Sequence, residues 1–147
     1  MMRLPGFSGN SRFWWAGYAA WLVLLSILSS ITGPEPGTMP RIPGLDKVAH
    51  LVYFAGGACA LHIAFRLSFA RFRHPGPGLA IIVVTTTAIF GALDEWHQSF
   101  TPSRAGLDVW DWTADVAGAF VALWLAPRIF DLLPRKEEFP ANAAPAS

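Results

Sequence analysis

Charged residues are scarce in this chain of 147 residues. They make up 14% of the sequence, whereas soluble domains carry about 25%, and the mean hydropathy is +0.39. A net charge of +1 leaves no surplus of basic residues, which excludes nucleic acid as a partner. The single cysteine, Cys59, excludes an internal disulfide. These absences favour a membrane protein over a soluble domain.

Familiar catalytic signatures are also missing. The sequence has no H-E-x-x-H zinc motif, no G-x-S-x-G nucleophile motif and no glycine-rich phosphate loop. A catalytic function would therefore have to be built from single polar residues brought together by the fold.

Long uncharged runs are what the sequence does contain. Three of them cover residues 13–31, 48–65 and 79–93, and a fourth apolar run, at 110–129, begins with acidic turns and has Arg128 near its end. A helix needs about 20 residues to cross about 30 Å of hydrocarbon, so the third run has to extend to residue 98. The first run is longer than the apolar part of a signal peptide and lacks a small-residue cleavage site. We therefore expect an all-α, polytopic membrane protein with about four transmembrane helices, all of them retained.

The runs divide the chain into three parts. Residues 1–12 form a short basic segment, residues 13–130 form the four-helix domain, and residues 131–147 form a polar tail that we expect to be disordered. Residues 32–44 are rich in proline and glycine, which predicts an irregular connector after the first helix.

Basic residues indicate the orientation. Eight of the eleven flank one set of helix ends: Arg3, Arg12, Arg66, Arg71, Arg73, Arg128, Arg135 and Lys136. Because cytoplasmic loops carry an excess of Lys and Arg, we expect both termini in the cytoplasm. The connectors 32–47 and 94–110 would then face outward.

Polar residues of three helices reach the same depth. Counted from the cytoplasmic helix ends at 1.5 Å per residue, His50, Asp94 and Asp115 lie about 20–24 Å away, just below the outer edge of the hydrocarbon. A charged group facing lipid at this depth would cost several kcal/mol, so we expect these side chains to point inward. The acids near this layer outnumber the fixed cations Lys47 and Arg104, which favours protonation of carboxylates or a bound divalent cation. These acids are Asp46, Asp94, Glu95, Asp108, Asp111 and Asp115.

Small residues predict which helices lie close together. They recur every four residues in the last run, at Ala114, Gly118, Ala122 and Ala126, and Gly56 and Ala60 have the same spacing in the second run. Such ribbons let membrane helices approach closely, so we assign Gly118 a structural role between the second and fourth helices.

The polar motifs resemble those of the VanZ-like family of small bacterial membrane proteins. The matching features are D-K-V-A-H at residues 46–50 with Tyr53, D-E-W-H-Q at residues 94–98, F-T-P-S-R at residues 100–104, and Asp108-x-x-Asp111-x-x-x-Asp115-x-x-Gly118. Their order and spacing cover about residues 13–130. The family often has Gly where this chain has Ser103, and Asn where it has Asp115. The resemblance implies a polytopic membrane protein whose founding member is linked to teicoplanin resistance, without supplying a settled reaction.

The first functional hypothesis is an outward-facing pocket for the headgroup of an envelope lipid or a lipid-linked cell-wall precursor. Lys47 and Arg104 would hold a phosphate, assisted by Gln98 and Asp108. The remaining carboxylates would hold an amine or a divalent cation.

Two alternatives remain open. The first is a metal-assisted or acid–base hydrolase acting on a lipid-linked substrate, with His50 beside Asp46 and Glu95 beside His97 as bases and orienting partners. In this hydrolase Asp94, Asp111 and Asp115 would hold a hard cation. The second alternative is a structural latch of ion pairs and hydrogen bonds that holds the second, third and fourth helices together, in which Asp46–Lys47 and Arg104–Asp108 are ordinary interfacial pairs and Asp46 has only a structural role.

Overall fold

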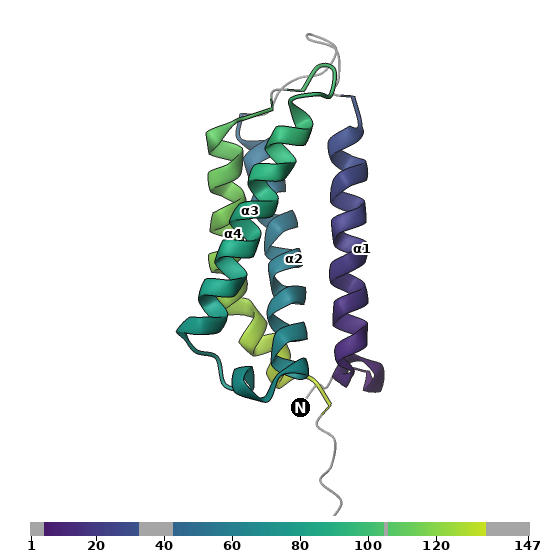
Figure 1. Cartoon of the computed structure of the whole chain (residues 1–147), viewed down its shortest axis with the longest axis vertical. Helices are drawn as coiled ribbons and strands as arrows, with labels where there is room; N and C mark the ends of the chain where they lie inside the picture. Colours follow the sequence, from purple (N-terminus) through teal and green to yellow (C-terminus); the bar gives the residue numbers. More distant parts are fainter. Residues whose placement is uncertain (1–4, 33–42, 105, 135–147) are drawn as a thin grey trace, which may run out of the picture.

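The computed structural model describes residues 5–32, 43–104 and 106–134 and contains four long helices in this part of the chain (Figure 1). All four are long and apolar enough to cross a membrane, which confirms the predicted all-α membrane bundle. Most of the predicted connector 32–44 and of the predicted tail 131–147 lies outside the described residues, as do residues 1–4. The helices are α1 (Ser11–Ser30), α2 (Leu45–Ser68), α3 (Pro77–Gln98) and α4 (Val109–Asp131), with short 3₁₀ turns at Gly6–Gly9 and Ala70–Phe72.

Local signals set the helix ends. The Asn10 side chain accepts a hydrogen bond from the Arg12 amide at the start of α1, and the Asp108 side chain caps α4 in the same way. Pro77 occupies the first turn of α3, where its missing amide hydrogen costs nothing. α3 continues to Gln98, as the shortness of its uncharged run predicted.

Helices α2 and α4 form the largest helix–helix interface in the described structure. A methyl group on Gly118 would lie 2.6 Å from the Leu51 carbonyl oxygen and 2.8 Å from the Ala55 amide nitrogen, so α4 touches the α2 backbone here. Ala122 and Ala126 continue this buried face, which confirms the predicted contact of the two helices. The prediction for Gly56 was wrong, because no atom lies within 4 Å of where its side chain would be.

Helix α1 is the least buried of the four, and α2 is the most buried. The Trp21 indole donates to the Tyr53 carbonyl oxygen at 3.0 Å, and the Tyr53 hydroxyl donates to the Trp21 carbonyl oxygen at 3.0 Å. This reciprocal pair attaches α1 to α2, and Figure 1 shows α1 and α4 on opposite sides of the bundle.

The two ends of the bundle differ in character. The described chain ends meet at one of them, where a side chain on Gly9 would contact Pro134. Arg66 is buried at the same end, with its guanidinium 3.7 Å from the centre of the Phe130 ring. The middle of the bundle is apolar and includes the buried Cys59. The α3–α4 connection lies at the opposite end, together with most of the polar residues singled out above (Figure 1).

Candidate functional site

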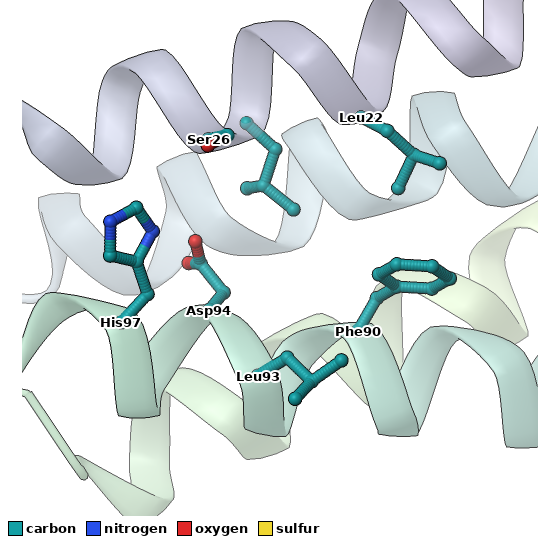
Figure 2. A pocket seen from close by; sticks show the side chains of 7 residues that line it. Leu22, Ser26, Phe90, Leu93, Asp94 and His97 are labelled. Atoms are coloured by element: carbon teal, nitrogen blue, oxygen red, sulfur yellow. The ribbon is translucent and has the colours of Figure 1, made fainter.

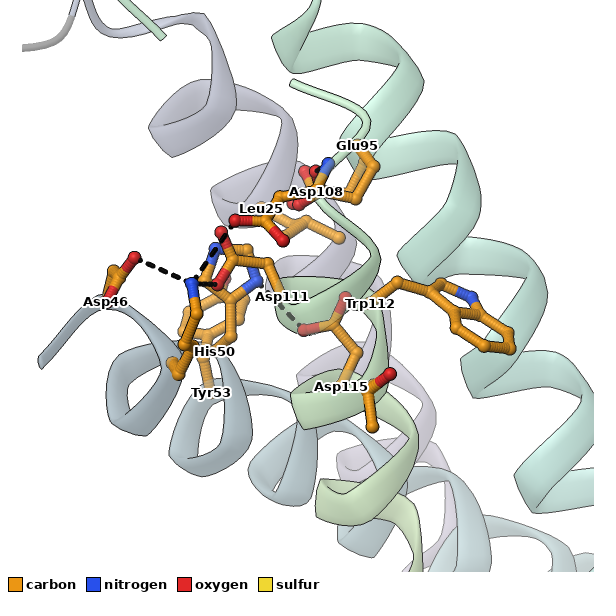
Figure 3. A network of polar contacts seen from close by, with 12 residues as sticks. Leu25, Asp46, His50, Tyr53, Glu95, Asp108, Asp111, Trp112 and Asp115 are labelled. Carbon is orange, nitrogen blue, oxygen red and sulfur yellow. Dashed lines mark hydrogen bonds and ion pairs between the residues drawn. The ribbon is translucent and has the colours of Figure 1, made fainter. Parts of the chain in front are cut away.

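Acidic and basic side chains from α2, α3 and α4 meet at the end of the bundle that carries the α3–α4 connection (Figure 3). We call this group the polar cluster; it consists of Lys47, His50, Asp94, Glu95, Asp108, Asp111 and Asp115. Four of its acids are buried, with exposed fractions of 5% for Asp94, 3% for Glu95, 7% for Asp111 and 0% for Asp115. Burying so many carboxylates is unfavourable unless they are paired, protonated or bound to a cation.

Lys47 provides the fixed positive charge within the cluster. Its ammonium nitrogen lies 2.8 Å from Asp111, 3.0 Å from Asp46 and 3.3 Å from Asp108. The Asp46 side chain is 58% exposed, whereas that of Asp111 is 10% exposed. The contact with Asp111 is therefore the one that compensates a buried charge.

His50 is positioned by Asp115. The His50 Nδ1 atom lies 2.9 Å from Asp115 Oδ1 across the α2–α4 interface. A side chain on Gly91 would lie 2.7 Å from Asp115 Oδ2, so this glycine of α3 makes room for the carboxylate. The predicted pairing of His50 with Asp46 was wrong, because the close packing at Gly118 brings α4 rather than the preceding turn of α2 to the imidazole.

Asp94 connects the cluster to α1. Its Oδ1 atom accepts a hydrogen bond from the Ser29 hydroxyl, and its Oδ2 atom accepts one from the Gln98 amide at 2.7 Å. Thr101 donates to the Ser29 carbonyl oxygen at 2.9 Å, which ties the α3–α4 connection to the same point. Ser29 was not among the predicted site residues, although the serines at positions 26, 29 and 30 share one side of the last turns of α1.

The α3–α4 connection folds back onto Glu95. The Asp108 amide donates to Glu95 Oε2 at 2.8 Å, and the Leu107 amide donates to the Glu95 carbonyl oxygen at 3.2 Å. Leu107 adopts φ 63°, a conformation that is costly for a branched residue and that turns both amides toward α3. Glu95 Oε1 is buried and has no hydrogen-bond partner among the described residues. The predicted pair of Glu95 with His97 was wrong, because His97 lies toward Ser30, 3.4 Å from its hydroxyl.

Asp108 lies just before α4. Its Oδ1 atom accepts a hydrogen bond from the Trp110 amide at 2.8 Å, and Oδ2 contacts Lys47. The Trp110 amide, and to a lesser extent the Lys47 ammonium, lower the pKa of the Asp108 carboxyl below its ordinary value. Asp108 is thus an ionised cap rather than a free ligand for a headgroup.

Arg104 does not join the polar cluster, contrary to the prediction. Its guanidinium donates to the carbonyl oxygens of Leu28 at 2.9 Å and Ile31 at 3.2 Å. These carbonyls belong to the C-terminal end of α1, where the regular hydrogen bonds of the helix stop and the Ile31 amide donates to the Leu28 oxygen at 3.2 Å. Arg104 therefore satisfies the end of α1, and the predicted contact with Asp108 is not made.

Three potential metal ligands converge within the described structure. One ligand atom each from His50, Asp94 and Glu95 lies within 4.8 Å of the other two. The predicted set of Asp94, Asp111 and Asp115 was wrong, because Asp111 faces Lys47 and Asp115 faces His50. The spacing of Asp111 and Asp115 along α4 correctly indicated that both lie on one buried face of this helix, but it did not indicate the partner of each carboxylate.

A groove between α1 and α3 leads to the cluster from the side (Figure 2). It has a volume of about 180 Å³ and is lined by Leu22, Leu25, Ser26, Phe90, Leu93, Asp94 and His97. Its walls are mainly apolar, and Figure 2 shows Asp94 and His97 together at one end. Asp94 thus belongs both to the groove and to the polar cluster.

No family model, curated protein or solved structure matches this chain. The VanZ-like resemblance therefore stays a prediction.

Proposed function

We propose that the chain is a multi-pass membrane protein whose polar cluster binds the headgroup of an envelope lipid or a lipid-linked cell-wall precursor. The position of Asp94 carries this proposal. Its carboxylate belongs to the cluster and also forms part of the groove wall between α1 and α3. An apolar chain lying in the groove would bring the attached headgroup to the buried carboxylates.

The groove suits an amphiphile. Leu22, Leu25, Phe90 and Leu93 offer apolar contacts, and Asp94 stands at the polar end. Binding sites for small molecules usually combine apolar walls with a few convergent polar groups.

Charge favours recognition of a positive group. Lys47 already contacts three aspartates, and Arg104 is bound to carbonyl oxygens of α1. The cluster therefore complements an ammonium group, or a divalent cation that bridges to a phosphate, better than a bare phosphate. The sequence predicted that Lys47 and Arg104 would bind the phosphate of the headgroup. We propose instead that the cluster recognises the positively charged part of the headgroup.

The proposed location is the bacterial inner membrane, with the polar cluster facing outward. The distribution of Lys and Arg supports cytoplasmic termini, and the contact of Gly9 with Pro134 supports both ends lying on one side. The VanZ-like resemblance extends the proposal to a contribution to glycopeptide resistance.

Thermal unfolding of the purified protein in detergent tests this proposal. Short-chain phosphatidylethanolamine should raise the Tm by several degrees, since a ligand that binds only the folded state stabilises it. Asp94→Asn and Leu22→Trp, which remove the charge and fill the groove, should abolish the shift. Val23→Trp is the matched control, because Val23 is exposed on the neighbouring position of α1.

Two results would overturn headgroup binding. One is a Tm that no tested lipid changes, with phosphatidylcholine and phosphatidylglycerol included as comparisons. The other is an equal shift in wild type, Leu22→Trp and Val23→Trp, which would show that lipid acts only on the outer surface of the bundle.

A hydrolase is the second candidate function, favoured by the convergence of His50, Asp94 and Glu95. A divalent ion at these donors would activate water toward a lipid-linked phosphate. Release of the headgroup from phosphatidylethanolamine vesicles, lost in Glu95→Gln and with chelator, would favour this function over binding alone.

The structural latch predicts different behaviour. If the polar cluster only joins helices, Asp94→Asn and Asp115→Asn should lower the folded yield without changing lipid binding or any envelope phenotype. A normal yield with lost lipid binding would contradict the latch.

A further inference from the structure

We infer that His50, Asp94 and Glu95 form a binding site for one divalent transition-metal ion, with Asp115 positioning the histidine. This site supplies the ion on which the second candidate function rests. It does not depend on lipid binding, and it is tested without turnover.

The first argument is convergence. His50 comes from α2, while Asp94 and Glu95 come from α3, yet one ligand atom of each lies within 4.8 Å of the others. Bonds from Zn²⁺ to histidine nitrogen and carboxylate oxygen are about 2.0–2.2 Å long, so ligands on opposite sides of an ion are about 4 Å apart. The three donors are thus within about 1 Å of the spacing that one ion requires.

The second argument is an unpartnered oxygen. Glu95 is 3% exposed, and its Oε2 atom accepts the hydrogen bond from the Asp108 amide. Oε1 is buried without a partner among the described residues. A buried carboxylate oxygen without a hydrogen bond is rare in folded proteins and points to an additional ligand. A metal ion at the three donors would satisfy it.

The third argument is the orientation of His50. Its Nδ1 atom faces Asp115 Oδ1 at 2.9 Å, which leaves Nε2 as the nitrogen that can bind a metal. A carboxylate on the far nitrogen is the arrangement that commonly fixes the ring of a metal-binding histidine. Asp115 is itself fully buried and held beside Gly91, so the ring has a rigid support.

The fourth argument is the orientation of Asp94. Ser29 and Gln98 each donate a hydrogen bond to one of its carboxylate oxygens. These bonds fix the plane of the carboxylate, and each oxygen keeps a second lone pair for a metal. All three donors thus have supporting hydrogen bonds, since Asp115 holds His50 and the Asp108 amide holds Glu95.

Charge and ligand type identify the class of ion. Two carboxylates and a neutral imidazole around a divalent cation carry no net charge, which suits a site buried among apolar helices. Ca²⁺ and Mg²⁺ prefer sets made only of oxygen, whereas a mixed nitrogen and oxygen set suits Zn²⁺ or Mn²⁺. We therefore expect Zn²⁺ or Mn²⁺.

The test uses the full chain in detergent, stripped with EDTA, reloaded with Zn²⁺ and analysed by elemental mass spectrometry. The expected result is one ion per chain, with the affinity weakened at least ~100-fold in His50→Gln and in Glu95→Gln. Asp115→Asn should weaken it by about 10–100-fold, the usual effect of removing a partner of a metal ligand. His74→Gln and Asp131→Asn are the controls and should bind Zn²⁺ like the wild type.

A measurement on the wild type guards against variants that fail to fold. Mn²⁺ added to the stripped protein should show hyperfine coupling to one imidazole nitrogen in pulsed paramagnetic resonance. Absence of a retained ion, absence of nitrogen coupling, or equal affinity in folded His50→Gln and Glu95→Gln would each overturn the site. Retention of phosphatidylethanolamine binding in EDTA would separate that failure from a failure of headgroup binding.

Discussion

A methyl group on Gly91 would lie 2.7 Å from Oδ2 of Asp115, so the missing side chain on α3 provides the space for a buried carboxylate on α4. Asp115 in turn holds His50 from α2. Gly91 thus makes room for the Asp115 carboxylate, at which α2, α3 and α4 come into contact.

Gly91→Ala should destabilise the protein. Forcing an extra methyl group into a packed site costs roughly 1–3 kcal/mol, and here it would also displace the partner of His50. Thermal unfolding in detergent should therefore show a lower Tm than that of the wild type. Gly56→Ala is the matched control, since nothing lies within 4 Å of its side-chain position and alanine favours helix. An unchanged Tm in Gly91→Ala would contradict the packing at this contact.

Lys47→Met should destabilise the protein because Asp111 would lose its cation. The Asp111 side chain is 10% exposed, and a buried carboxylate without a partner is strongly unfavourable. We expect the Tm to fall by several degrees and to recover in the double variant Lys47→Met, Asp111→Asn. Asp46→Asn should change the Tm little, because Asp46 is an exposed partner of the same lysine. Additive effects of the two substitutions would contradict the pairing of Lys47 with Asp111.

Arg104→Ala should loosen the end of α1 without affecting the metal site. The substitution leaves the Leu28 and Ile31 carbonyl oxygens without their hydrogen bonds from the guanidinium. Hydrogen exchange should then increase in the last turn of α1, while the Zn²⁺ affinity of the reloaded protein stays the same. A loss of Zn²⁺ binding with unchanged exchange would instead place Arg104 at the polar cluster, as the sequence suggested.

Asp108→Asn should make the stability of the protein less sensitive to acid. Because the pKa of the Asp108 carboxyl is lower in the folded than in the unfolded chain, its ionised form adds stability above the ordinary carboxyl pKa of about 3.9. This contribution is lost as the pH falls through the lowered value. Asparagine keeps the cap of α4 but has no charge to titrate. The Tm difference between wild type and variant should therefore be positive at pH 7 and should shrink toward zero in acid.

The helices were predictable because each uncharged run ends at a strong signal. Arg66 closes the second run, Pro77 opens the third helix, and Asp108 caps the fourth. The extension of the third helix into Asp94–Gln98 followed from the thickness of a membrane alone. The contact of α2 with α4 followed from Gly118 and its neighbouring alanines, because only small side chains permit it.

The partners within the site were not predictable, because they depend on helix rotation and on backbone atoms. Regular spacing placed Asp46 beside His50, but the packing at Gly118 gives His50 to Asp115 instead. Arg104 binds backbone carbonyls of α1, which no motif in the sequence marks. In the turn that brings the Asp108 amide to Glu95, the positive φ lies at Leu107 and not at the neighbouring Gly106, so the sequence does not reveal the conformation of this turn.

Because Cys59 is buried, cysteine labelling can show which end of the bundle faces outward. Cys59 is 6% exposed and lies among apolar side chains, so a membrane-impermeant maleimide should leave its thiol unlabelled in intact cells. Cysteines introduced one at a time at Ser103 and His74, which are exposed at opposite ends of α3, can then be labelled without first removing the native thiol. Labelling of Ser103→Cys alone from outside would put the polar cluster on the exterior, and labelling of His74→Cys alone would reverse the orientation.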